Sequence, residues 1–230
     1  MYKDKKFSKL DRMYSQHLYT GFVGIFMHYC HKNLELYDFG ENLSKILEIG
    51  PGTVPHAPYI KHSYEEYHIL ETSDYAIQDL KRQGYKKIKS YDGVAIPYSD
   101  ESFDRIIMSH VLEHINNPHN FLLDLIKKLK KGGVLSISLP TDPGFFWRAS
   151  RQLIKILSLH KDQNLSNLEY DYINSIEHIN SIFNLRNIIK YHFFGNYSET
   201  FLPFRIRLPD LNLFYNVHIK KNGKIYDNAN

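Results

Sequence analysis

Cysteine is nearly missing from this chain, since Cys30 is the single one in 230 residues. A lone cysteine cannot form an internal disulfide or a paired-cysteine zinc site, and this favours a reducing compartment. Long apolar runs are also lacking, because the longest, around residues 21–30, is too short to span a bilayer and contains His28. The N-terminal segment has neither the apolar core nor the cleavage site of a signal peptide. We therefore expect a cytoplasmic protein without a membrane span.

The chain also lacks a large excess of either positive or negative charge. The 29 Lys and Arg residues against 25 Asp and Glu give a formal net charge of +4, and most basic residues are scattered. The one dense group, at residues 127–131, lies near the end of an expected helix, where basic side chains compensate the helix dipole. Charge alone therefore indicates no nucleic-acid partner. What remains is an ordinary globular composition, 43% hydrophobic and 23% charged, in a length that suits one domain.

Strand and helix patterns alternate along most of the chain. Residues 8–39 have apolar and aromatic side chains at three- and four-residue spacings, which predicts one or two helices that form a cap before the first strand. Strands are then predicted at residues 45–48, 67–71, 86–90, 105–109 and 134–139, and helices at residues 57–62, 74–83 and 118–130. Such alternation is typical of a parallel, doubly wound sheet, whose ligands bind at the carboxyl ends of the strands.

The alternation of strand and helix patterns ends after Pro140. Residues 141–195 have a largely helical pattern, longer than a plain crossover, and predict an insertion. Two strand-like segments follow at residues 197–208 and 211–221, and their connection through Pro209 and Asp210 predicts an antiparallel hairpin at a sheet edge. We expect one domain over residues 1–230, with a helical cap at 1–40 and the insertion at 141–195.

The first predicted strand leads into a turn rich in glycine and proline, "LEIGPGTVPHA", with the acid Glu48 inside the apolar run. A dinucleotide fingerprint requires a third glycine three positions after Gly52, and Pro55 stands there instead. A P-loop is excluded because no Gly-Lys-Ser/Thr follows. The turn thus keeps an acid and a Gly-Pro-Gly without the signature of either nucleotide motif.

Four segments between residues 45 and 140 form a series of motifs. "LEIGPGT" has an acid two residues before a Gly-x-Gly turn, and "YHILETSD" is a strand with Glu71 at its end. "YDGVAIPYSDESFDRIIMSHVLEHINNP" and "LKKGGVLSISLP" follow. In this order they resemble the motifs of class I S-adenosylmethionine-dependent methyltransferases, type 11 subgroup. The chain departs from that pattern at Val54 and Pro55, where a third small residue is usual, and at Tyr91, where a glycine is frequent.

The resemblance implies a Rossmann-like α/β fold with a seven-stranded, mostly parallel sheet and an antiparallel last strand. It also implies S-adenosylmethionine as the cofactor and S-adenosylhomocysteine as the product. The backbone of Gly50, Pro51 and Gly52 would pass close to the methionine and ribose of the cofactor, where any side chain would collide. By the same resemblance, Glu48 would meet the amino end of the methionine.

The remaining cofactor-binding residues are assigned from the same motifs. Glu71, followed by Thr72, is expected to accept hydrogen bonds from both ribose hydroxyls. Asp92 would accept one from the adenine amino group, with Gly93 beside the ring. Ser109 would line the floor near the sulfonium. Over the cofactor, Tyr14 and Tyr19 of the N-terminal cap are expected to act as a lid.

A histidine of near-neutral pKa suits the removal of a proton from a hydroxyl acceptor. His110, just beyond the strand predicted at residues 105–109, is the first candidate for this catalytic base. His178, in the insertion, is the second. His114 is expected to fix its loop by hydrogen bonding. No metal-ligand cluster is visible at the mouth of the site, so no metal is expected and a metal-assisted reaction is disfavoured.

The resemblance therefore implies methyl transfer to a small molecule, and the acceptor we expect is a hydroxyl oxygen of a polar metabolite such as a sugar or a phosphorylated precursor. "SHVLEH" stands where methyltransferases of nucleic-acid bases have Asn/Asp-Pro-Pro-aromatic, which argues against nucleic acid. A quinone-like or lipid acceptor is the next choice. The alternatives of another class are a non-catalytic methyltransferase-like partner protein and an NAD-dependent enzyme, which Pro55 disfavours. We expect a monomer or a homodimer.

Overall fold

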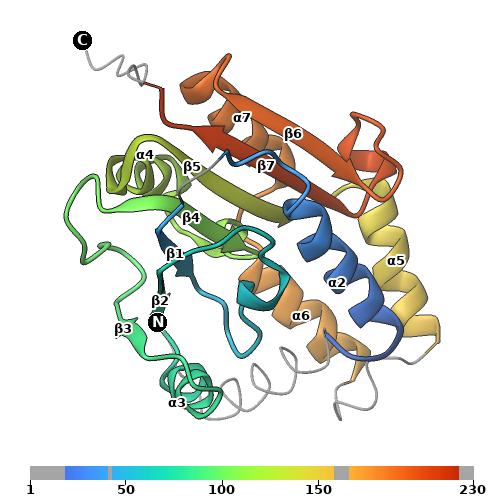
Figure 1. Cartoon of the computed structure of the whole chain (residues 1–230). Helices are drawn as coiled ribbons and strands as arrows, with labels where there is room; N and C mark the ends of the chain where they lie inside the picture. The colour runs from blue at the N-terminus through green and yellow to red at the C-terminus, as the bar shows by residue number, and fades with distance from the viewer. Residues whose placement is uncertain (1–18, 41–42, 158–165, 223–230) are drawn as a thin grey trace.

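Seven strands form one continuous sheet in the part of the chain that the computed structural model describes, residues 19–40, 43–157 and 166–222 (Figure 1). The strand order is β3-β2-β1-β4-β5-β7-β6, and only β7 runs antiparallel to both of its neighbours. This confirms the expected α/β fold. The strands are β1 (Lys45–Ile49), β2 (Glu66–Glu71), β3 (Lys87–Ser90), β4 (Phe103–Ser109), β5 (Leu129–Pro140), β6 (Tyr197–Leu202) and β7 (Phe214–Lys220).

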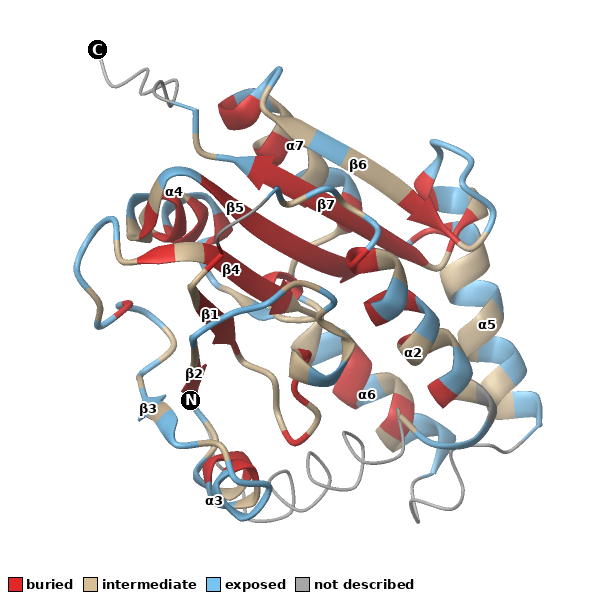
Figure 2. Ribbon diagram, in the orientation of Figure 1, coloured by how far each residue is buried: buried red, intermediate tan, exposed pale blue. Residues whose placement is uncertain are grey.

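Helices cover both faces of this sheet. The large core cluster packs α4 and α7 on one face, and smaller clusters pack α2 on the other, so the sheet is buried from both sides (Figure 2). The helices are α2 (Gly21–Leu34), α3 (Asp74–Arg82), α4 (Pro118–Lys128), α5 (Phe145–Ile156), α6 (Asn167–Glu177) and α7 (Ile182–Phe193), with short 3-10 turns η1 (Ala57–Tyr59), η2 (Leu112–His114) and η4 (Pro209–Leu211).

The two faces of the sheet differ in polarity. Successive side chains of a strand point to opposite faces, so in β1 Leu47 and Ile49 enter the large core while Glu48 points to the face under α2. Arg105 in β4 and Ser136 in β5 share that second face, because both alternate with residues of the large core. The sheet therefore has an apolar face under α4 and α7, and a face with buried polar groups under α2.

Sequence-predicted boundaries are wrong at two helices, and the strand predicted at residues 197–208 ends already at Leu202. The helix expected at residues 57–62 is only the turn η1, where Pro58 leaves a single short 3-10 segment. The helix expected to reach residue 130 ends at Lys128, and the next residues already belong to β5. Gly132 donates a backbone hydrogen bond to Lys221 and Gly133 accepts one from it, so long-range pairing overrides the local glycine stop signal.

The segment between β5 and β6 is helical, as predicted, and carries α5, α6 and α7. Ser166 and Glu169 form a capping box that begins α6, and Ser181 caps the start of α7. Of the two lid tyrosines, Tyr14 lies outside the described residues, whereas Tyr19 precedes α2. In the described part of the chain, no helix combines the length and the apolar character needed to cross a membrane.

Candidate functional site

The glycine turn after β1 begins the candidate site. Gly50 and Gly52 both have φ of +60°, a left-handed conformation that glycine adopts without strain. The Gly50 N–H donates to the Leu70 carbonyl at 2.7 Å, and a Cβ at Gly50 would lie 2.9 Å from the Val111 side chain. A Cβ at Gly52 would meet no described atom within 4 Å. The turn is therefore closely packed at Gly50, and Gly52 faces open space.

Glu71 holds this turn from the end of β2. Its Oε2 accepts a hydrogen bond from the Gly52 N–H at 2.9 Å, and its Oε1 accepts from the Thr72 and Ser73 N–H groups at 2.7 and 2.9 Å. The carboxylate is buried and has about four acceptor positions, of which the described residues use three on the backbone. An acceptor position on Oε2 is left at the mouth of the turn.

Asp92 follows β3 two residues beyond its end. Its Oδ1 accepts from the Val94 and Ala95 N–H groups at 2.8 and 3.1 Å, and these bonds lower the pKa of Asp92. Gly93 has φ of +82°, and a Cβ there would lie 3.7 Å from the Thr72 methyl group. The Asp92 turn therefore lies against the loop that follows Glu71, and the exposed Asp92 carboxylate remains ionised.

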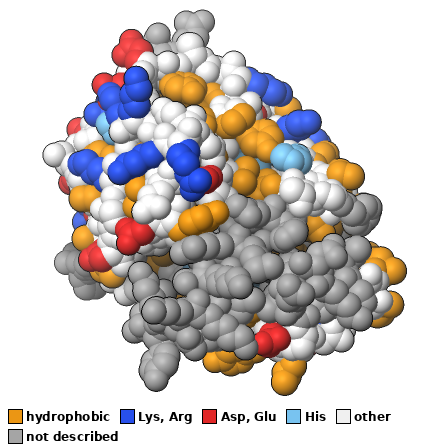
Figure 3. Space-filling view, turned by 90° about the horizontal axis from the view of Figure 1, so that it is seen from below, with side chains coloured by type: hydrophobic (Ala, Val, Ile, Leu, Met, Phe, Trp, Pro, Cys, Tyr) orange, Lys and Arg blue, Asp and Glu red, His pale blue; other side chains and the backbone are white. Residues whose placement is uncertain are grey.

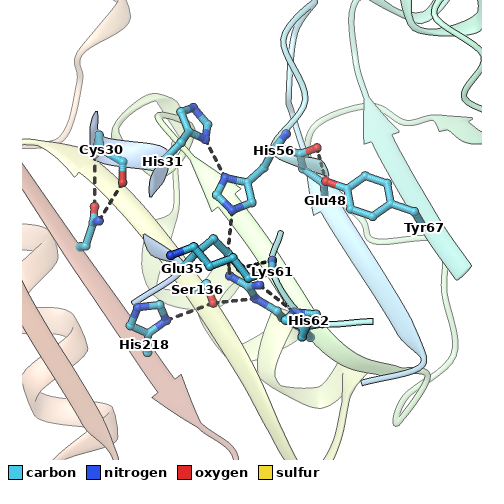
Figure 4. Close-up of polar contacts among 12 residues, drawn as sticks. Cys30, His31, Glu35, Glu48, His56, Lys61, His62, Tyr67, Ser136 and His218 are labelled. Carbon is cyan, nitrogen blue, oxygen red and sulfur yellow. Dashed lines mark hydrogen bonds and ion pairs between the residues drawn. The ribbon is translucent and has the colours of Figure 1, made fainter. Parts of the chain in front are cut away.

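Glu48 lies beneath the turn, where Figure 4 shows it between His56 and Tyr67. Its Oε1 accepts from the His56 N–H at 2.9 Å, and its Oε2 is bound to the Tyr67 hydroxyl at 2.6 Å. Burial raises the pKa of Glu48 to about 8, although both hydrogen bonds act in the opposite direction. The carboxyl group therefore supports the loop from the protein interior, and both of its oxygens already have partners.

We expect the stability of the chain to respond to the ionisation of Glu48. Its folded pKa of about 8 lies above the unfolded value, so its favourable contribution is complete at low pH and is lost as pH rises from about 4.5 to 8. Relative to Glu48→Gln, the wild type should lose on the order of 1 kcal/mol per pH unit in this window. Urea unfolding of both proteins from pH 5 to 8 measures the difference.

Tyr67→Phe is the matched variant for this experiment. It removes the hydroxyl that lowers the pKa of Glu48, so the loss of stability with rising pH should continue to higher pH than in the wild type, with the same limiting slope. Parallel pH profiles for the wild type and Glu48→Gln would show instead that Glu48 is ionised at neutral pH in the folded chain.

A buried hydrogen-bonded chain connects α2 to the turn (Figure 4). His56 Nε2 lies 2.8 Å from the Glu35 carboxylate and must donate to it, so His56 Nδ1 accepts from His31 Nδ1 at 2.6 Å. His31 Nε2 then accepts from the Tyr19 hydroxyl at 2.7 Å. At the other end, Arg105 donates to Glu35 at 2.6 Å. Tyr19 thus takes part in a fixed polar network.

Burial sets the protonation of this network. It lowers the pKa of His31 and of His56, so both rings are neutral at physiological pH. Burial alone would raise the pKa of Glu35, but hydrogen bonds from His56 and Arg105 outweigh it and lower the pKa to about 2. Among the described residues of this network, the charged groups are then Glu35 and Arg105, which form a buried pair.

His110 lies directly after β4 and follows Ser109 at the carboxyl edge of the sheet. It has φ of +55°, which is unusual for a residue with a side chain and is a form of backbone strain found at functional sites. Its N–H donates to the Ser138 carbonyl at 2.9 Å, which fixes this backbone in place. The ring packs edge to face with Phe214 at 5.5 Å between centroids.

The structure also gathers residues that are far apart in the sequence. Glu113 and His114 of η2 lie beside His178, and the possible ligand atoms of the three side chains lie within 4.8 Å of one another. His178 Nδ1 is 2.7 Å from an oxygen of Asp142. The cluster cannot be recognised in the sequence, because 64 positions separate His114 from His178. The expectation that no metal binds at the mouth of the site therefore stays a prediction, and the fold adds these three possible ligands to it.

Several buried polar atoms at this edge have no hydrogen bond to any described residue. Such atoms are rare in folded proteins, and they collect where a ligand, an ion or a water completes the site. They come from three segments: the glycine turn, the loop after β4, and α5. The atoms are Thr53 Oγ1, His110 Nε2, both carboxylate oxygens of Glu113, Trp147 Nε1 and Arg151 Nε.

The fold and this edge define the class of protein. A sheet of order 3-2-1-4-5-7-6 with a Gly-x-Gly turn after β1 and acids after β2 and β3 is that of a class I methyltransferase. Residues 25–191 match the family described as methyltransferase domain. The chain belongs to this family.

Solved structures share the fold at low sequence identity. A possible histamine N-methyltransferase from Thermotoga maritima is 18% identical, with a TM-score of 0.54 over 90% of this chain and 99% of that one. The plantazolicin methyltransferase in complex with a triazolic desmethyl analogue and SAH is 16% identical, with a TM-score of 0.65 over 95% and 92%. A putative methyltransferase from Haloferax volcanii, in complex with the Trm112 activator, is 11% identical, with a TM-score of 0.63 over 96% and 100%. No curated protein matches the sequence.

Proposed function

We propose that this chain transfers the methyl group of S-adenosylmethionine to a hydroxyl oxygen of a small polar molecule. The observation that carries the proposal is the set of unpaired buried polar atoms on His110 and Glu113, in the loop after β4, and on Trp147 of α5, whose ring packs on Phe214 as that of His110 does. A polar ligand that enters this space can pair with those atoms. The proposed place of the acceptor is therefore between the loop after β4 and α5.

The methyl donor is S-adenosylmethionine, the cofactor of the family to which the chain belongs. The residues present fit it: Gly52 is open to a ligand, and Glu71 has an acceptor position free for ribose hydroxyls. The buried Thr53 hydroxyl beside the turn adds a further group to be satisfied. When bound, the cofactor supplies a methyl group already activated on a sulfonium.

On the donor side each residue has a proposed task. Gly50, Pro51 and Gly52 give the backbone surface for the methionine and ribose, and Thr72 lies beside the ribose. Asp92 accepts from the adenine amino group, with Gly93 against the ring. We assign Glu48 a supporting role toward the amino end of the cofactor, because its oxygens lie under the turn with His56 and Tyr67 as partners.

On the acceptor side the proposed catalytic base is His110. The reaction requires a nucleophile held in line with the methyl group, and a base that takes the hydroxyl proton. Support comes from the fixed, strained backbone of His110 and from its unpaired Nε2 at the end of β4. His178, the second candidate, lies near Glu113 as well and is bound through Nδ1 to Asp142.

The surroundings favour a small polar acceptor over the alternatives. The indole of Trp147 stacks on His178 at 6.1 Å between centroids. Such a flat ring beside titratable side chains suits a polar molecule with a flat face better than a lipid. In Figure 3, the Lys and Arg side chains of the described residues are interspersed with hydrophobic and acidic ones, so the described part of this face has no continuous basic surface of the kind that nucleic acid requires. We retain the proposal of a monomer or homodimer.

Two measurements test the proposed function. Calorimetric titration of the purified chain with S-adenosylmethionine should give one site, and a labelled methyl group should pass from the cofactor to a component of a polar metabolite pool. Transfer only to a lipid extract would overturn the acceptor class. Binding without transfer to any pool would favour the alternative of a non-catalytic methyltransferase-like partner.

A further inference from the structure

We propose that Glu113, His114 and His178 form a binding site for a divalent transition-metal ion, with Zn²⁺ as the first candidate. Glu113 and His114 belong to the turn η2, and His178 follows the last residue of α6. Their possible ligand atoms lie within 4.8 Å of one another. The site therefore joins the loop after β4 to the helical insertion.

Glu113 gives the first reason for a cation. Its side chain is buried, and neither oxygen has a hydrogen bond to any described residue. The nearest basic atoms, His110 Nδ1 and His114 Nε2, lie 3.7 and 3.8 Å from Oε1, too far for a hydrogen bond. A buried carboxylate without hydrogen bonds is costly, and a metal ion between it and the two ligand histidines supplies the missing interaction.

The orientation of the two histidines gives the second reason. His114 Nδ1 lies 2.7 Å from the Glu177 carbonyl, and His178 Nδ1 lies 2.7 Å from an Asp142 carboxylate oxygen. Both partners are acceptors, so Nδ1 donates in each ring and Nε2 of the neutral ring keeps its lone pair. Histidines that bind metals have this arrangement, in which a carbonyl or carboxylate fixes the tautomer and the direction of the ring.

The backbone around the cluster is already held together. Asn180 donates its N–H to the Glu113 carbonyl at 3.0 Å and its side-chain amide to the Ile115 carbonyl at 2.7 Å. The end of α6 is thereby fixed to η2, and the three ligands come from rigid neighbouring segments. Little reorganisation remains for metal binding, which favours affinity.

The ligand set selects the kind of ion. Two imidazoles and a carboxylate suit Zn²⁺ and similar transition metals, whereas Mg²⁺ and Ca²⁺ prefer oxygen ligands. Zinc ligands lie about 2 Å from the ion and therefore about 3.3 Å from one another. Glu113 Oε1 and His114 Nε2 lie 3.8 Å apart, and a small side-chain rotation would bring them to this ligand–ligand distance. Three protein ligands leave a fourth position open, as in catalytic zinc sites.

The open position lies beside the proposed acceptor site. An acceptor hydroxyl bound to the ion would have a lowered pKa. His110, whose Nδ1 lies 3.7 Å from Glu113 Oε1, would then be near enough to take the proton of that hydroxyl. This role rests on the proposed methyl transfer, while the metal site itself does not.

The full-length chain, freed of metal with a chelator and dialysed, should bind one Zn²⁺ per chain in calorimetric titration. His114→Ala and Glu113→Gln should each weaken this binding at least tenfold. His114 is partly exposed, and glutamine keeps the size of Glu113, so both variants should fold, which circular dichroism checks. A millimolar excess of Mg²⁺ should not displace Zn²⁺.

His119→Ala is the matched control. His119 of α4 and His192 of α7 are a further close histidine pair, at 3.0 Å, and the control should keep wild-type affinity. Absence of a stoichiometric site in the wild type, or unchanged affinity in both His114→Ala and Glu113→Gln, would overturn the proposal. Methyl transfer is measured separately, so Zn²⁺ binding without transfer refutes the proposed function alone, and transfer without Zn²⁺ binding refutes the metal site alone.

Discussion

Glu71→Ala should lower the affinity for S-adenosylmethionine by at least about 100-fold. The variant removes the proposed acceptor of both ribose hydroxyls, and each hydrogen bond to a charged group is worth about 1.5–3 kcal/mol. It also leaves the Gly52, Thr72 and Ser73 N–H groups without their carboxylate, so the glycine turn loses its support. Calorimetric titration with the cofactor measures the change.

Two further variants separate binding from folding. Glu71→Gln keeps the size and one acceptor oxygen, so it should retain the fold more closely than Glu71→Ala and still bind the cofactor weakly. Glu66→Ala, at the opposite end of β2 on a half-buried side chain, is the control and should bind normally. Unchanged cofactor affinity in Glu71→Ala would refute the ribose assignment.

His110→Asn should lose turnover while it keeps cofactor affinity. General base catalysis contributes about 10²- to 10⁴-fold to a rate, so kcat should fall within this range. Asparagine is chosen because it tolerates the left-handed backbone of His110, where φ is +55°, better than most residues. The assay uses the acceptor that the labelled-methyl experiment identifies, with calorimetry of the cofactor in parallel.

The control for this variant is His119→Asn, which replaces an exposed histidine of α4 and should have wild-type kcat. A kcat of His110→Asn within a few-fold of wild type would exclude His110 as the base. A parallel loss of cofactor affinity would indicate that the loop after β4 had been displaced, and it would assign His110 a structural role instead.

The donor half of the site could be predicted from the sequence because each of its residues lies next to a strand. Once β1, β2 and β3 are recognised from their apolar patterns, parallel pairing brings the glycine turn, Glu71 and Asp92 to one edge of the sheet. The order of the motifs then determines their neighbours. Local pattern and global fold agree in this half of the molecule.

The acceptor half and the polar face under α2 could not be predicted in this way. His178 meets Glu113 only because Asn180 fixes the end of α6 to η2, and no periodic pattern encodes that contact. Arg105 occupies a fully buried strand position, which composition rules assign to apolar residues. Its partner Glu35 comes from a segment 70 positions earlier, so the pair is visible only in the folded chain.

The hydrogen-bonded chain from Tyr19 to Glu35 limits which parts of the molecule can open the site. In the described part of α2, His31 takes part in this chain, and the Cys30 carbonyl accepts from the Asn216 side chain at 3.2 Å. Moving this helix away would leave several buried donors and acceptors unsatisfied, at about 1–3 kcal/mol each. This part of α2 is therefore held in place, and under the proposed function the acceptor and the methylated product would pass other segments of the site.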